Sequence, residues 1–159
     1  ILAEGMEELG MESGITSRNT DDNYVSDCTI ETDQLALIPD SYIDMTAEKI
    51  RIYKELDSTT SDKELENMKK RLEDRFGPMP DELSRLFDIV RIRQLGQKLG
   101  FEKIIIKNGV MIAFFIYNPL SQYYRSDRFS KILENISLNP KIFELKQNDN
   151  KLRVFAITV

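Results

Sequence analysis

The 159-residue sequence contains no histidine, no tryptophan and a single cysteine, Cys28. Without histidine, His-based acid–base catalysis and Cys–His nucleophiles are excluded, and with one cysteine so are zinc fingers and intrachain disulfides. Cys28 precedes Thr29 and Ile30 in an extended run, which indicates a buried strand residue rather than a reactive thiol. This cysteine usage fits a reducing, cytoplasmic compartment.

Long apolar runs and catalytic motifs are also missing. No stretch of 18 apolar residues occurs, so no membrane partner is expected. The patterns GxxxxGK[ST], GxSxG and HExxH are absent, and the acidic pairs lie in predicted linkers or helix ends. No signal-peptide pattern follows Ile1, which indicates that the chain begins inside a longer protein. Catalysis is therefore the least supported class, and the sequence predicts no cofactor and no metal.

The composition, with 41% apolar and 31% charged residues, is typical of a globular protein, but the charge is uneven. Residues 1–66 carry 17 acidic and 5 basic side chains, whereas residues 67–159 carry 10 acidic and 17 basic ones. A basic half can bind nucleic acid, or it can attract the acidic half or a partner domain. We favour attraction, because the basic residues are dispersed and no aromatic–basic array accompanies them.

Helical patterns dominate the first hundred residues. Residues 2–11 predict a short helix, residues 12–27 a flexible linker and residues 28–38 an extended segment ended by Pro39. Thr46 is predicted to cap a helix that runs to about residue 57 and turns Ile50, Tyr53 and Leu56 inward. Two further helices are predicted over residues 61–76, where Ser61 and Glu64 have capping-box spacing, and over residues 80–99, the widest apolar helix.

The remaining residues predict two hairpins around one helix. The first hairpin pairs residues 101–107 with 110–117 through Asn108-Gly109, which suits a type I′ turn. Its second strand is apolar almost throughout, which indicates burial on both faces or a central place in the sheet. Asp127 is predicted to cap a helix up to residue 139, and residues 142–146 and 152–158 predict the second hairpin. The expected fold class is α+β, with a helical N-terminal part packed on a C-terminal antiparallel ββαββ sheet.

The stretch from Glu66 to Pro80 carries the most information about function. It ends one amphipathic helix, turns at Gly77 and Pro78, and starts the next helix at Pro80. Within it, Glu73 and Asp74 stand near a helix C-terminus, where the helix dipole disfavours acids. Two interpretations remain open: a surface ion pair or loop contact, or a docking surface on which a partner's arginine satisfies Asp74.

Three motifs, in this order and spacing, resemble the C-terminal domain of bacterial transcription-repair coupling factor. They are Ile-Pro-Asp-Ser-Tyr-Ile at residues 38–43, Arg-Ile-Tyr-Lys-Glu-Leu at 51–56 and Leu-Glu-Asp-Arg-Phe-Gly-Pro-Met-Pro at 72–80. An Arg-Ile-Arg run at residues 91–93 and a Leu-Gly helix end at 99–100 follow them. The resemblance covers residues 28–159 as a regulatory domain, and residues 1–27 resemble the helix end and linker after the motor region.

The resemblance implies a parent protein that is an ATP-driven DNA translocase, with ATP and Mg bound outside this fragment. Such a protein displaces stalled RNA polymerase and recruits the nucleotide excision-repair protein UvrA, whereas this domain is not an enzyme and holds no cofactor. The implied direct partner is the N-terminal UvrA-binding module of the same chain. The resemblance further implies that the domain masks this module, which is autoinhibition, and that UvrA and RNA polymerase are only indirect partners.

The family's inter-domain contact lies around the Asp-Arg-Phe-Gly turn, so the resemblance assigns docking to Asp74, Arg75 and Gly77, with Glu73 beside them. This chain has Arg71 where the family carries a second acidic residue one helical turn earlier, and Glu66 or Glu73 is expected to compensate. The alternative function is a nucleic-acid-binding accessory domain that uses the basic C-terminal half, although direct DNA contact is not expected.

Overall fold

The computed structural model describes residues 24–149 and 151–157. The predicted helix over residues 2–11 and most of the predicted linker lie outside the described residues. In chain order the elements are β1 (Thr29–Thr32), α2 (Thr46–Ser58), α3 (Asp62–Phe76), α4 (Asp81–Leu99), β2 (Phe101–Lys107), β3 (Val110–Phe115), the 3-10 helix η1 (Gln122–Arg125), α5 (Asp127–Leu138), β4 (Phe143–Asn148) and β5 (Lys151–Ile157).

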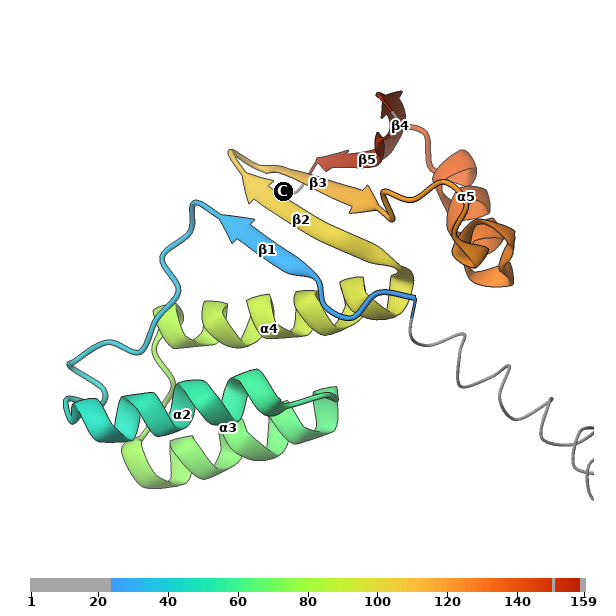
Figure 1. Cartoon of the computed structure of the whole chain (residues 1–159). Helices are drawn as coiled ribbons and strands as arrows, with labels where there is room; N and C mark the ends of the chain where they lie inside the picture. The colour runs from blue at the N-terminus through green and yellow to red at the C-terminus, as the bar shows by residue number, and fades with distance from the viewer. Residues whose placement is uncertain (1–23, 150, 158–159) are drawn as a thin grey trace, which may run out of the picture.

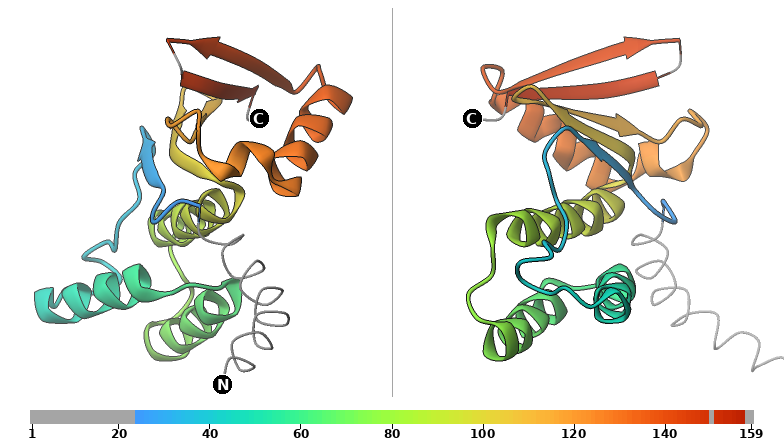
Figure 2. Two further views of the ribbon diagram at one scale, coloured as in Figure 1. Left: turned by 45° about the vertical axis from the view of Figure 1, so that its right-hand side comes forward. Right: turned by 90° about the vertical axis from the view of Figure 1, so that its left-hand side faces the viewer.

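The five strands form one mixed sheet in the order β1-β2-β3-β5-β4. Helix α4 runs beneath the sheet, with α2 and α3 beyond it, while α5 lies beside β4 (Figures 1 and 2). The α+β class and the ββαββ order are confirmed. The sheet is not purely antiparallel, however, because β1 joins it parallel to β2, with Ile30 opposite Ile104.

Two hydrophobic clusters hold the fold together, and α4 contributes to both. The helical cluster contains Ile38, Ile43, Ile52, Leu56, Leu65, Met68, Leu72, Leu83, Phe87 and Val90. The sheet cluster contains Val25, Cys28, Phe101, Ile104, Ala113, Phe115, Ile116, Tyr123 and Val154, with Ile92 of α4 packed against it. The wide apolar surface predicted for residues 80–99 is therefore explained by a helix between two cores.

Close packing against α4 joins it to the sheet at Gly96. A Cβ at this position would lie 2.7 Å from the Cys28 Sγ atom and 2.9 Å from the Ile104 Cδ1 atom. Both neighbours are buried, with 0% and 3% of their surfaces exposed. Only glycine lets α4 approach β1 and β2 this closely. Cys28 is thus buried, as predicted, but it lies one residue before β1 rather than within a strand.

Several local predictions are confirmed because they depend on residues close in sequence. The Oγ atom of Ser61 accepts a hydrogen bond from the Glu64 N–H at 3.2 Å, and the Glu64 carboxylate accepts one from the Thr60 N–H at 3.4 Å. Asn108 and Gly109 have φ angles of 53° and 74°, as a type I′ hairpin turn requires.

Two predicted capping residues are wrong by one position. Met45 has the extended backbone of the cap before α2, so Thr46 is already helical and the cap has no side-chain hydrogen bond. Before α5, Ser126 is the cap, since its Oγ atom accepts from the Phe129 N–H at 3.2 Å. Asp127 is instead the first helical residue, where its charge complements the helix dipole.

The extended segment predicted over residues 28–38 ends early. The Thr32 Oγ1 atom accepts from the Gln34 N–H at 3.1 Å, which bends the chain away from the sheet, and Leu35 is 59% exposed. On α2 the inward face is also different from the prediction. Ile52 and Leu56 are buried, whereas Ile50 is 48% exposed and Tyr53 is 38% exposed.

Across residues 24–149 and 151–157, the structure contains no helix with the length and apolarity that crossing a bilayer requires.

Candidate docking surface

The turn between α3 and α4 is held rigidly from two sides. Gly77 adopts φ 94° and ψ −174°, a backbone region that is nearly restricted to glycine, and its N–H donates to the Glu73 carbonyl at 3.0 Å. The Tyr42 hydroxyl donates to the Gly77 carbonyl at 2.7 Å and lies 3.2 Å from the Leu72 carbonyl. Burial, reinforced by the Glu73 carboxylate, raises the pKa of Tyr42, so this donor keeps its proton at neutral pH.

Glu73 serves the turn itself. Its Oε2 atom accepts a hydrogen bond from the Met79 N–H at 3.1 Å, just before α4 begins. The start of α4 has no side-chain cap of its own, because Pro80 occupies the cap position. Glu73 therefore fixes the entry to α4 and is already engaged within the domain.

Arg75 is likewise engaged, by a residue of α2. Its Nη2 and Nη1 atoms lie 3.2 and 3.4 Å from the two carboxylate oxygens of Glu48, and its guanidinium stacks 4.8 Å from the centre of the Phe76 ring. One turn earlier, Arg71 pairs with Glu55 of α2, and Arg51 pairs with Glu48. The acids of α2 thus hold the arginines of α3.

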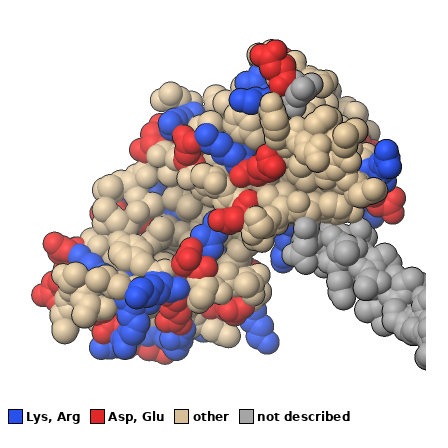
Figure 3. All heavy atoms as spheres, in the orientation of Figure 1, with Lys and Arg blue, Asp and Glu red and all other residues tan. Residues whose placement is uncertain are grey.

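These charges border a groove of about 340 Å³ between α2 and α3. Ile52, Leu72 and Phe76 supply its apolar lining. At its rim the side chains of Arg51, Arg71 and Arg75 are 60% to 64% exposed, whereas that of Glu48 is 12% exposed. Acidic and basic side chains are intermixed over this end of the molecule (Figure 3). The rim of the groove is therefore mainly guanidinium groups, with the Glu48 carboxylate largely covered and the Glu55 carboxylate partly exposed at 39%.

Asp74 differs from its neighbours. It lies in the last turn of α3 and is exposed. Its carboxylate forms no hydrogen bond or ion pair with any residue in the described part of the chain. The negative end of the helix dipole makes this position unfavourable for an acid, and no described group offsets that cost through a direct contact.

Glu66 and Arg71 do not follow the expected compensation. Glu66 pairs with Arg91 of α4, which also contacts Asp62 at 2.5 Å and Asp88 at 3.1 Å. The hydrogen bond with Asp62 is the main cause of a raised Arg91 pKa. Glu66 therefore joins α3 to α4, and the carboxylate beside Arg71 comes from Glu55 instead.

Four of the five predicted docking residues, Glu73, Asp74, Arg75 and Gly77, surround one turn, and Glu66 lies apart from them. The residues of α2 that complete this surface, Glu48 and Glu55, were not predicted from the sequence. The charge pattern of α2 could have indicated these residues, because Glu48 and Glu55 are seven positions apart and so share one helical face.

The uneven charge of the sequence is visible as ion pairs between the two halves. Besides the pairs of Arg71, Arg75 and Arg91, the Arg93 guanidinium contacts Asp57 at 2.8 Å and Asp27 at 3.8 Å. The halves therefore attract each other, as the charge pattern of the sequence indicated.

No group of three or more acidic or cysteine side chains in the described ranges is arranged to hold a metal ion. The surface is suited to docking through ion pairs.

Comparisons with known proteins bear on this surface. The family model of the TRCF domain matches residues 32–126. A transcription-repair-coupling factor of Rickettsia bellii is 34% identical over 125 residues, which are 78% of this chain and 10% of that protein. The factor of Escherichia coli is 40% identical over 75 residues, which are 47% and 6% of the two chains. The matched part of the chain thus spans a tenth or less of the length of these curated relatives.

A solved structure shares the fold. It is a crystal structure of the C-terminal domain of transcription-repair coupling factor, which matches with a TM-score of 0.69 and 21% identity over 82% of this chain and 79% of that one.

Proposed function

The chain belongs to the TRCF domain family, and from this membership we propose that it is a regulatory domain that docks reversibly on another module of its parent protein. The domain that it matches in the factor is not itself the catalytic domain. The relatives are bacterial DNA-repair proteins by name, which supports a role in coupling transcription to repair.

The proposal extends to the parent. We propose that the parent is an ATP-dependent DNA translocase, and that this domain masks a UvrA-binding module in the same protein. UvrA and RNA polymerase would then be indirect partners of the domain. The names of the relatives and the resemblance of the motifs around residues 38–80 support this extension.

The observation that carries the proposal is the state of Asp74. Its neighbours Glu73 and Arg75 are engaged by the Met79 N–H and by Glu48, and the turn behind them is fixed by Tyr42. Asp74 is left exposed on a rigid support, without a partner in the described part of the chain. A carboxylate presented in this way can accept two hydrogen bonds from an arginine on the masked module.

Docking of this kind controls affinity by a shift of populations. The masked state hides the UvrA-binding module, so the apparent affinity for UvrA falls in proportion to the fraction of open molecules. An arginine–carboxylate bond at the interface that contributes about 1.4 kcal/mol lowers the open fraction up to tenfold when the closed state dominates.

The test is Asp74→Ala in the full-length parent protein. We expect its affinity for UvrA to rise up to tenfold, measured by fluorescence anisotropy with labelled UvrA. Arg75→Ala is expected to act in the same direction, although it also removes the contact with Glu48. The matched control is Glu134→Ala, which removes an exposed helical carboxylate on α5 and is expected to leave UvrA affinity unchanged. If Asp74→Ala and Arg75→Ala both bind UvrA like the parent, the docking role is refuted.

The alternative, a nucleic-acid-binding module, depends on free basic groups in the C-terminal half. Arg91 and Arg93 are occupied by carboxylates, as are Lys103 and Lys107, which both contact Glu31. A salt titration of duplex DNA binding by the 159-residue chain separates the two functions. A phosphate-binding domain binds measurably and loses affinity steeply as salt rises, whereas we expect no such binding.

A further inference from the structure

One face of the sheet is not covered by any described helix. Helices α4 and α5 lie on the same side of the strands, and the opposite side is open in both views of Figure 2. Strand alternation and register assign to this open face a central apolar group, namely Ile105, Val110, Ile112, Phe114, Phe155 and Ile157. Ile157 is 67% exposed, and the other five are partly exposed. We call these residues, with the charged residues around them, the open face.

Strand β3 is less buried than its sequence predicted, and the open face explains why. The almost continuous apolar run of β3 predicted burial on both faces or a central place in the sheet. Strand β3 is central, between β2 and β5, but only Ala113 and Phe115, which point toward the helices, are buried. The outward residues Ile112 and Phe114 have the composition of a covered strand without a described cover.

Most charges of the open face neutralise one another. Lys103 and Lys107 both contact Glu31, at 2.5 and 3.8 Å, and Lys146 contacts Glu144 at 3.7 Å. Lys146 also lies 4.6 Å from the centre of the Phe155 ring. These lysines therefore frame the apolar group with charges that already have partners.

Lys151 is on the same side of β5 by strand alternation, is exposed, and has no carboxylate partner among the described residues. Arg153 is the second exception. It stands beside Phe114 in the register of β3 and β5, and its guanidinium lies 5.4 Å from the centre of the Phe155 ring. Its Nε atom is buried and has no hydrogen-bond partner, and no carboxylate in the described ranges pairs with this side chain. A buried donor without an acceptor is destabilising, and a carboxylate supplied from outside would recover that lost hydrogen bond.

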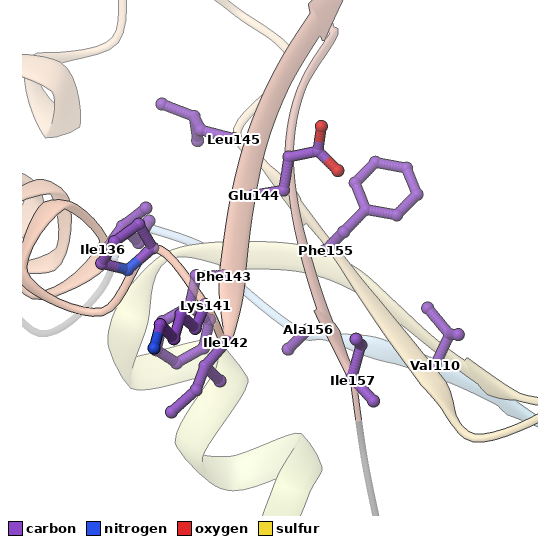
Figure 4. A pocket seen from close by; sticks show the side chains of 11 residues that line it. Val110, Ile136, Lys141, Ile142, Phe143, Glu144, Leu145, Phe155, Ala156 and Ile157 are labelled. Atoms are coloured by element: carbon purple, nitrogen blue, oxygen red, sulfur yellow. The ribbon is translucent and has the colours of Figure 1, made fainter.

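A hollow of about 640 Å³ lies around the β4 and β5 edge of the sheet, and residues of both faces line it. Val110, Phe155 and Ile157 border it together with Ile142 and Phe143. In Figure 4, Phe155 and Glu144 lie on one side of the β4–β5 ribbon, and Ile136 and Leu145 lie on the other. Ile142 and Ile157 are 51% and 67% exposed, so the hollow can receive an apolar side chain of a partner.

We infer that the open face binds an amphipathic helix of a partner protein, whose apolar stripe covers Ile112 and Phe114 and whose carboxylate pairs with Arg153. A helix suits the face because it would complete a third layer on a sheet that now has helices on one side only. The charge count of the face supports an acidic partner, since its five cations, Lys103, Lys107, Lys146, Lys151 and Arg153, face two carboxylates.

The same observations disfavour a nucleic acid on the open face. Phosphate binding along a strand needs several free cations, but only Lys151, at the start of β5, and Arg153 lack a carboxylate among the described residues of this face. The setting of Arg153 among Ile112, Phe114 and Phe155 instead matches a single ion pair inside an apolar contact.

The experiment uses a pair of synthetic amphipathic peptides of about 18 residues, roughly 27 Å long, with a leucine stripe. One peptide carries Glu at the centre of the stripe and the other carries Gln. Fluorescence anisotropy measures their affinity for the 159-residue chain, and NMR of the labelled chain maps the contact. We expect the Glu peptide to bind at least tenfold more tightly and to shift the amide signals of β3 and β5.

Two variants test the assigned partner of the carboxylate. Arg153→Met is expected to abolish the preference for Glu over Gln, whereas Arg125→Met, at an exposed arginine of η1, is expected to preserve it. Circular dichroism reports whether each variant folds. If Arg153→Met does not fold, the comparison of the Glu and Gln peptides on the native chain still tests the inference.

Four results would overturn the inference: equal affinity for the two peptides, no binding at millimolar peptide, shifts confined to other surfaces, or a Glu preference that Arg153→Met retains. A chain dimer that Arg153→Met dissociates would assign the face to a second copy. Duplex DNA binding that is lost in Arg153→Met and weakens steeply with salt would assign it to phosphates.

Discussion

Gly96→Ala tests whether α4 is fixed to the sheet by the close approach at Cys28. The new Cβ would lie 2.7 Å from the Cys28 Sγ atom and 2.9 Å from the Ile104 Cδ1 atom, well inside ordinary contact distances of about 3.5–4.0 Å. Overpacking of this kind costs about 1–3 kcal/mol, and the higher helix propensity of alanine returns about 1 kcal/mol. Because both neighbours are buried, we expect a net loss of about 1–2 kcal/mol in the free energy of unfolding.

Cys28→Ala should rescue this loss if the contact with sulfur is its cause. Alone, it removes one buried atom and is expected to cost about 1 kcal/mol. In the double variant the alanine methyl at position 96 occupies the space that the sulfur leaves. We therefore expect the double variant to be at least 1 kcal/mol more stable than the sum of the two single effects predicts.

The assay is urea unfolding at 25 °C followed by circular dichroism, with linear extrapolation to water. The control pair is Cys28→Ala with Gly77→Ala, because Gly77 lies at the opposite end of α4 and has no atom near its missing Cβ. The control pair is expected to be additive within about 0.5 kcal/mol. Additivity of Gly96→Ala and Cys28→Ala within the same margin would refute the reasoning.

Two further predictions concern pH and capping. Burial raises the pKa of the Cys28 thiol from 9.0 to about 11, so the folded state keeps a proton that the unfolded state releases. The associated stability is complete below about pH 8 and falls by up to about 3 kcal/mol between about pH 9 and 11, and the difference between the native chain and Cys28→Ala in urea unfolding at each pH isolates it. Ser126→Ala, which loses the bond from the Phe129 N–H, is expected to cost about 1 kcal/mol in the same assay, whereas Asp127→Ala costs only a few tenths; equal effects would contradict Ser126 as the cap.

Local chemistry made much of the fold predictable. The Ser61–Glu64 capping box and the Asn108-Gly109 turn each involve residues within a few positions, so their residue types alone specify the geometry. The parallel pairing of β1 with β2 joins Thr29 to Lys103, 74 positions apart, and no local pattern encodes such a partner.

The inward face of α2 was not predictable for a different reason. Ile50, Tyr53 and Leu56 form one helical stripe, and Ile52 and Leu56 form another that overlaps it. Which stripe is buried depends on where α3 and α4 lie, and the structure buries Ile52 with Leu56. Tyr53 instead accepts a hydrogen bond from the Ile38 N–H at its hydroxyl, 2.9 Å away, and stays partly exposed.

The candidate site shows the same division. The turn at Gly77 and the exposed Asp74 follow from a helix that ends where glycine and proline end it. The roles of Arg71 and Arg75 do not follow, because their partners Glu55 and Glu48 belong to another helix. Arg71, a departure from the family pattern in sequence, becomes part of an ion-pair row between α2 and α3.

Asp74 and Arg153 share a property that separates docking from folding. Asp74 carries a charge that the end of α3 disfavours, and Arg153 buries a donor without an acceptor, a cost that its stacking on Phe155 offsets only in part. Neither side chain is therefore expected to stabilise the isolated chain. Their removal by Asp74→Ala or Arg153→Met should therefore leave the free energy of unfolding unchanged or raise it. A residue kept only for folding would show the opposite. Weaker docking to the partner together with an undiminished free energy of unfolding would thus mark each side chain as one that serves a partner.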